Sequence, residues 1–109
     1  PEKKHYWPHA RGDVDHYGQT PYKIPMDFDR KLAWKYESPN YNTIMWGALI
    51  DSEKNVYVAG MDGVHKFSPD GEHLWHSPMA SSEMPTLAGD KLIGMQMMDV
   101  VMYALDLET

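Results

Sequence analysis

The chain has 109 residues, which sets an upper limit of one domain. Hydrophobic residues make up 42% and charged residues 24%, a balance that predicts a globular chain and argues against wholesale disorder. With 16 acidic and 10 scattered basic residues the net charge is -6, so the chain lacks the basic surface that binds nucleic acid.

The absence of cysteine excludes disulfides, thiolate catalysis and cysteine-ligated zinc, and it leaves the redox compartment open. No apolar run approaches the roughly 20 residues that span a bilayer, because the longest, Val100 to Leu105, has the length of a strand. The sequence begins with Pro1, so we expect any targeting peptide to have been removed or left out.

Residues 1–30 are rich in Pro, His, Tyr, Gly and Asp and have no periodicity, which predicts an extended N-terminal arm. From residue 31 onward, short apolar runs alternate with turn signals, and their β-branched and aromatic residues favour strands. No segment has a 3.6-residue stripe, so we predict an all-β meander. Its strands are expected at "LAWKY" (32–36), "IMWGALI" (44–50), "NVYVAG" (55–60), "VHKF" (64–67), "HLW" (73–75), "KLIGMQM" (91–97) and "VMYAL" (101–105).

Two connectors predict chain reversals. Asp62-Gly63 separates "NVYVAG" from "VHKF", and Gly63 can take the positive φ of a primed hairpin turn, so these two runs are expected to pair antiparallel. In Pro69-Asp70-Gly71, proline presets the first turn angle and glycine relieves the strain of the last, which predicts a second reversal before "EHLW".

Internal repetition organises the chain beyond the arm. "LAWKYES" (32–38) resembles "HLWHSPM" (73–79), and Trp34 precedes Trp75 by 41 positions. "VHKFSPDGE" from Val64 aligns with "MYALDLET" from Met102 at an offset of 38. Similar offsets at two independent places predict a unit of about 40 residues used twice, which is the size of a four-stranded propeller blade.

We therefore predict a partial β-propeller, with the arm over residues 1–30 and about two four-stranded antiparallel blades over residues 31–109, the second incomplete at its C-terminus. A blade buries its faces only against neighbouring blades. Two blades leave large apolar faces open to water, and burial of such surface at about 25 cal/mol per Å² is the main term that holds blades together. We expect this chain to need a partner.

The repeats resemble the pyrroloquinoline-quinone-like (PQQ-like) β-propeller family from Trp7 to Thr109. "NVYVAGMDGVHKFSPDGEHLW" is similar to a hairpin and blade exit, and "YALDLET" is similar to the Ala-x-Asp-x-x-Thr-Gly signature, with Ala104, Asp106 and Thr109 in place. "WPHARGDVDHYGQTP" looks like the segment that leads into such propellers. The residues that carry this last likeness are Trp7, Pro8, Arg11, Gly12, Asp13, Gly18 and Pro21.

The resemblance implies a ring of about seven or eight blades. We therefore expect this sequence to be a fragment, or a short subunit that a neighbour completes. Quinone-dependent members hold their cofactor and a calcium ion at the ring's axis, but those positions cannot be mapped onto these residues, so no cofactor is assigned. Many relatives carry the repeats without a cofactor and act as scaffolds that bind other proteins.

Trp34 and Trp75 occupy the repeated position, which favours a structural role. Each is expected to pack its indole between adjacent blades, with the indole N–H bound to a backbone carbonyl. Ala104 and Asp106 are expected to serve the same packing. The functional alternative, stacking on a quinone, would require a unique position in the ring.

Three other groups of residues invite a metal, and each has a simpler explanation. Asp13-x-Asp15-x-x-Gly18 resembles the start of a calcium loop, but Tyr17 and Ile24 stand where oxygen ligands are needed. Local backbone hydrogen bonds at a turn explain these residues better.

His5, His9 and His16 could ligate zinc or copper, but the arm has no helix to bring them together, so exposed histidines are predicted. The methionines around residues 95–102 would suit Cu(I), but alternation along a strand disperses their sulfurs, which favours core or interface filling. These methionines are Met95, Met97, Met98 and Met102.

Catalytic motifs are absent from the sequence, and the carboxylates fall mostly in predicted turns, where solvation or turn hydrogen bonds account for them. The carboxylates concerned are Glu37, Asp51, Glu53, Asp62 and Asp90. We assign no catalytic residue and no metal ligand.

The sequence thus predicts a noncatalytic protein-interaction or scaffold module, an accessory subunit or fragment within a multisubunit assembly. Its partners would be other protein subunits or the remainder of its own propeller, with no transmembrane segment of its own. A complex associated with a membrane, facing a periplasmic or organelle lumen, is the favoured setting. The alternatives are a fragment of a PQQ- and calcium-dependent quinoprotein dehydrogenase and a metal-handling protein that uses His and Met.

Overall fold

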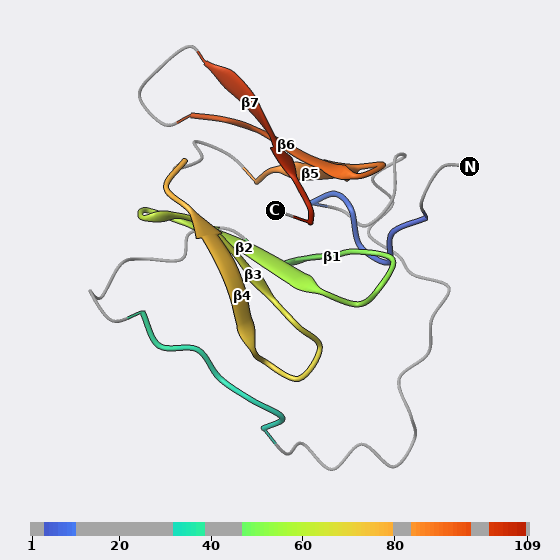
Figure 1. The fold of residues 1–109 in the computed structure, drawn as a ribbon, viewed down its shortest axis with the longest axis vertical. Helices are drawn as coiled ribbons and strands as arrows, with labels where there is room; N and C mark the ends of the chain where they lie inside the picture. The colour runs from blue at the N-terminus through green and yellow to red at the C-terminus, as the bar shows by residue number, and fades with distance from the viewer. Residues whose placement is uncertain (1–3, 11–31, 39–46, 80–83, 97–100, 109) are drawn as a thin grey trace.

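The computed structural model describes residues 4–10, 32–38, 47–79, 84–96 and 101–108. Within these ranges the protein is all-β, as predicted, with two antiparallel sheets and no helix (Figure 1). It follows that this part of the chain contains no helix that could cross a membrane.

Both sheets are meanders in which neighbours in sequence are neighbours in the sheet. The first has the order β1-β2-β3-β4 and the second the order β5-β6-β7, and they do not close into a ring. The strands of the first sheet are β1 (Leu49–Ile50), β2 (Val56–Gly60), β3 (Gly63–Phe67) and β4 (His73–Ser77). Those of the second are β5 (Thr86–Ala88), β6 (Lys91–Met95) and β7 (Met102–Asp106).

Five of the predicted strands are confirmed as β2, β3, β4, β6 and β7, and three expectations need correction. The run 32–36 is not a strand, because it forms no backbone pairing with the other described residues, and its aromatic side chains pack on the first sheet instead. Of the run 44–50, the described part is strand only at β1. The strand β5 was not predicted. The second sheet, which was expected to be incomplete, has three strands in the described residues.

The two predicted reversals are present. Gly60 pairs with Gly63 across the two-residue turn Met61–Asp62, and Gly63 has the expected positive φ, 120°. The turn is not of the predicted primed type, because Met61 and Asp62 both lack positive φ. A Cβ at Gly63 would lie 1.9 Å from the Ser77 carbonyl oxygen, so the close approach of β4 also requires glycine there. In the second reversal the Gly71 N–H donates to the Ser68 carbonyl (3.0 Å), and Gly71 has φ 91°.

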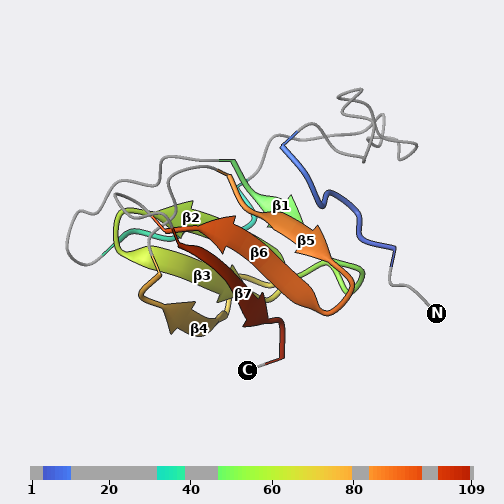
Figure 2. The same cartoon turned by 90° about the horizontal axis from the view of Figure 1, so that it is seen from above.

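The second sheet lies across one face of the first, and the two share one hydrophobic core (Figures 1 and 2). Lys66 crosses between them, because its buried Nζ donates to the Leu107 carbonyl at 2.6 Å. The core residues are Leu49, Tyr57, Ala59 and Val64 from the first sheet, and Leu87, Leu92, Tyr103 and Leu107 from the second.

The described part of the N-terminal segment, residues 4–10, attaches to both sheets. Trp7 and Ile50 exchange two backbone hydrogen bonds (2.9 and 3.0 Å), and the Leu87 N–H donates to the Pro8 carbonyl (2.9 Å). This segment therefore bridges β1 and β5.

His5, predicted to be exposed, is buried, and that prediction is wrong. Its Nδ1 accepts from the Ser52 N–H (3.1 Å), so its Nε2 carries the proton that is donated to the Gly89 carbonyl (2.8 Å). One turn from each sheet converges on this ring, which explains why the side chain is withdrawn from water.

Candidate functional site

The two repeated tryptophans make corresponding hydrogen bonds. The Trp34 indole N–H donates to the Pro69 carbonyl (3.1 Å), and the Trp75 indole N–H donates to the Leu107 carbonyl (3.3 Å). Pro69 and Leu107 are 38 positions apart, which is the offset of the second sequence repeat. Trp34, in the segment 32–38, thus binds the turn that follows β3, the third strand of the first sheet. Trp75, on β4, binds the residue that follows β7, the third strand of the second sheet.

The surroundings of the two indoles are aromatic and close. The Trp34 ring stacks on Phe67 with centroids 5.6 Å apart, and a Cβ added to Gly71 would lie 2.6 Å from Trp34 Cγ. The Trp75 ring is tilted against Tyr57 at 6.0 Å and packs on the shared core. Both rings therefore combine apolar burial with a satisfied N–H group.

The repeat also relates the faces of the two sheets. On β3, Val64 points into the shared core, whereas Phe67 points the other way, toward residues 32–38. On β7, Leu105 packs on the core and Met102 points away from it. At an offset of 38, Phe67 corresponds to Leu105 and Val64 to Met102. The face of the second sheet that carries Met102 is therefore equivalent to the face of the first sheet that carries Val64 and is buried against the second sheet.

This outer face of the second sheet is apolar and exposed. Met95 and Met102 are directly opposite each other across β6 and β7 and are 39% and 70% exposed. Ile93 and Ala104 form the neighbouring pair. We define the outer face as Thr86, Ile93, Met95, Met102 and Ala104. The other two methionines of the predicted group, Met97 and Met98, lie outside the described residues.

An ion pair borders the outer face. Lys91 Nζ lies 3.0 Å from Asp106 Oδ2, and this hydrogen bond raises the pKa of Lys91. Asp106 Oδ1 also accepts from the Glu108 N–H (2.9 Å), so the carboxylate orders the end of β7.

The predicted packing residues are thus placed on β4 and β7 or in the segment 32–38. Of the residues that lead into the first sheet, Trp7 and Pro8 bridge the two sheets by backbone bonds. The others, and the last residue of the signature, lie outside the described residues: Arg11, Gly12, Asp13, Gly18, Pro21 and Thr109. The same applies to the calcium-loop candidates and to His16.

Asp51 holds the turn between β1 and β2. It is buried and accepts hydrogen bonds from the N–H groups of Glu53 and Asn55, from the Asn55 side chain and from the Tyr57 hydroxyl, at 2.8 to 3.0 Å. Burial pushes its pKa upward, but these hydrogen bonds outweigh burial and lower the pKa. Burial and the bond to Asp51 raise the pKa of Tyr57. The turn role predicted for this carboxylate is confirmed.

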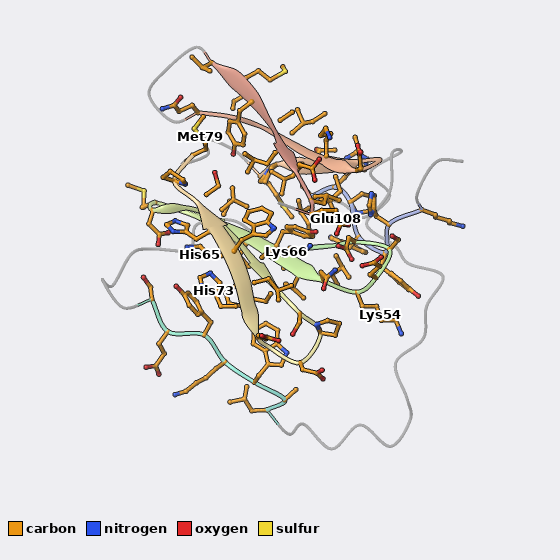
Figure 3. All side chains as sticks on the ribbon, viewed as in Figure 1. Lys54, His65, Lys66, His73, Met79 and Glu108 are labelled. Carbon is orange, nitrogen blue, oxygen red and sulfur yellow. The ribbon has the colours of Figure 1, made fainter. Side chains whose placement is uncertain are left out.

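A cluster of histidines lies on the face of the first sheet that points away from the second sheet. His65 is 3% exposed, and its Nε2 lies 3.0 Å from Asp62 Oδ2, while its Nδ1 lies 3.1 Å from His73 Nε2. The His76 ring stacks on His65 with centroids 4.2 Å apart and planes 3° apart. Figure 3 shows His65 and His73 between the sheet and residues 32–38, where Tyr36 contacts both rings.

A bulge brings these side chains together. β3 and β4 pair Lys66 with Trp75 and then Phe67 with His73, so Leu74 is an extra residue on β4. Without it, alternation would place His73 and His76 on opposite faces.

This cluster was not predicted from the sequence, in which the histidines of the arm were the candidate metal ligands. The available signal was hairpin pairing, because the confirmed reversals place His65 opposite His76 on antiparallel strands. The bulge has no such signature.

Burial, followed by the charges of His65 and His76, lowers the pKa of His73, which favours its neutral ring.

No family model, curated protein or solved structure matches the chain.

Proposed function

We propose that this chain is a noncatalytic protein-interaction module that presents the outer face of its second sheet to a further antiparallel sheet, in the manner of a PQQ-like β-propeller. One observation carries the proposal. Val64, in the first repeat, is 0% exposed beneath the second sheet, whereas its equivalent Met102 is 70% exposed. An apolar face that is covered in one repeat and open in the next is the expected form of an interface that repeats.

The corresponding hydrogen bonds of Trp34 and Trp75 also support stacking of a further sheet on the outer face. Trp34 binds a turn of the first sheet, and Trp75, on the first sheet, binds a turn of the second. Each step places an indole on the following sheet. A further sheet on the outer face would extend this series by one step.

The edge of the second sheet supports strand pairing with the partner. β4 lies beside β3 in the first sheet, whereas β7 is the last strand of the described second sheet. An added strand beside β7 would give the second sheet the four-stranded form of the first, and backbone hydrogen bonds would supply affinity. A polypeptide that offers a strand and an apolar face fits this edge and the adjoining outer face.

A second copy of this chain fits less well. In a stacked repeat, the outer face would contact the face of the incoming sheet that carries Phe67. Trp34 and Tyr36 already cover Phe67 in this chain, with ring centroids 5.6 and 4.9 Å away. The partner is therefore a different sheet of the same repeat type.

Site-specific photo-crosslinking tests the proposal in the cells that make the protein. A benzophenone amino acid replaces Met102 on the outer face, or Leu32, which is 74% exposed but belongs to the segment 32–38. We expect cross-links from position 102, mapped by mass spectrometry to a β-strand of the partner, and none to that partner from position 32. Absence of a cross-link at 102, or equal cross-linking at both positions, would contradict the proposal.

A further inference from the structure

We propose that Asp62, His65 and His76 form a binding site for a late first-row divalent metal ion, with Zn²⁺ as the representative case. One ligand atom from each side chain lies within 4.8 Å of the others. Two imidazole nitrogens and one carboxylate oxygen are a donor set that suits such ions and leaves coordination positions for water. This site is on the opposite side of the first sheet from the second sheet and is independent of the interface proposed above.

Local structure fixes two of the three ligands. Asp62 belongs to the two-residue turn between β2 and β3, and His65 follows on β3 with its ring buried. The carboxylate and His65 Nε2 are already 3.0 Å apart, so they face the same point. Little conformational freedom would be lost at these two residues on binding.

His76 is the adjustable ligand. A metal lies in the plane of each imidazole that binds it, but the His65 and His76 rings are parallel and 4.2 Å apart. One ring must therefore turn, and His76 is the exposed one. Its Nε2 now lies 2.6 Å from the Asp62 carbonyl oxygen, a hydrogen bond that holds the ring beside the site.

His73 would act as the positioning residue. When His65 Nε2 gives its lone pair to a metal, the ring proton must sit on Nδ1, which faces His73 Nε2 at 3.1 Å. A neutral His73 can accept that proton in a hydrogen bond if its own proton moves to its Nδ1. His65 is then oriented in the way that metal-bound histidines usually are.

The expected consequence is a metal-dependent clamp. Asp62 and His65 lie on the β2–β3 hairpin and His76 on β4, so a bound ion would join them by a link other than backbone hydrogen bonds. An ion that binds the folded chain and not the unfolded chain raises the free energy of unfolding in proportion to the logarithm of its concentration.

Isothermal titration calorimetry of the full chain with ZnCl₂ tests the site. His76→Ala removes an exposed ligand, and Asp62→Asn removes the carboxylate charge while keeping the size of the side chain. His9→Ala removes a histidine of the N-terminal segment and is the matched control. Far-UV circular dichroism verifies that each variant is folded.

We expect the wild-type chain to bind one equivalent of Zn²⁺. His76→Ala and Asp62→Asn should each weaken binding about tenfold or more, and His9→Ala should leave it unchanged. Co²⁺ in place of Zn²⁺ should give visible absorption bands that His76→Ala abolishes. No binding by the wild-type chain, or an equal loss in all three variants, would overturn the proposal.

Discussion

Val64 and Met102 occupy equivalent positions in the two repeats, yet Val64 is fully buried and Met102 is 70% exposed. The difference lies in what covers them, because the second sheet packs on Val64 and no described residue of this chain covers Met102 to the same degree. Two positions that are equivalent in the repeat thus have two environments. The proposed interface follows from this contrast.

The contrast predicts that an introduced aspartate strongly destabilises the fold at position 64 and has little effect at position 102. Val64→Asp places a charge in the shared core and should lower the free energy of unfolding by several kcal/mol or prevent folding. Met102→Asp should change it by less than about 0.5 kcal/mol, because the side chain is in water. Urea denaturation followed by circular dichroism measures both. Equal destabilisation would show that Met102 is part of the core.

Trp75→Phe should lower the free energy of unfolding by about 1 kcal/mol through loss of the hydrogen bond to the Leu107 carbonyl. Phenylalanine removes the N–H donor and leaves an aromatic ring beside Tyr57. Trp7→Phe is the control, because the bonds between Trp7 and Ile50 are made by the backbone. A larger loss for Trp7→Phe in the same denaturation experiment would argue against the indole bond.

Gly71→Ala and Gly89→Ala form a second matched pair. Both glycines have positive φ, 91° and 60°, so alanine is strained at either position by about 1–2 kcal/mol. At Gly71 the new Cβ would also meet the Trp34 ring at 2.6 Å, whereas at Gly89 it meets nothing within 4 Å. Gly71→Ala should be the more destabilising variant in chemical denaturation. The reverse order would mean that Trp34 does not lie against this turn.

Asp51 should make the chain sensitive to acid. Its pKa is lower in the folded than in the unfolded state, so the unfolded state takes up its proton first as the pH falls. The stabilisation is complete above the unfolded pKa, near 4, and is lost as the pH drops through the folded pKa.

Asp51→Asn measures that contribution. The variant should be less stable than the wild type by about 1–3 kcal/mol at pH 7, because an amide cannot accept all the bonds made to the carboxylate. The difference between the two proteins should shrink as denaturation is repeated down to pH 3. A difference that stays constant with pH would rule out the lowered pKa.

Some of this structure could be predicted from the sequence. Strand texture, turn glycines and the two repeat offsets predicted the all-β class, five strands and both reversals, because these depend on local backbone preference. The run 32–36 has the same residue types as a strand but pairs with no strand in the part of the chain that the structure describes, and pairing is a tertiary property. Likewise, β5 is too short to give a pattern.

Predicting the candidate metal site would have required the register of the strands, which local sequence alone does not give. His65 and Asp62 lie close in sequence, but the approach of His76 depends on strand register, and that of His73 on the bulge at Leu74. The burial of His5 depends on two turns from different sheets. Hairpin pairing could have indicated the approach of His76 to His65, but the contacts of His73 and His5 have no counterpart in local spacing.

Binding of the hydrophobic dye bis-ANS to the purified chain tests the central claim most directly, since an open docking face should bind the dye. We predict dye fluorescence with the wild-type chain that falls with Met102→Asp and is unchanged by Leu32→Asp, which alters a side chain of similar exposure elsewhere. A folded wild-type chain that binds no dye, or a fall of the same size with Leu32→Asp, would contradict the claim that the second sheet carries an unfilled interface.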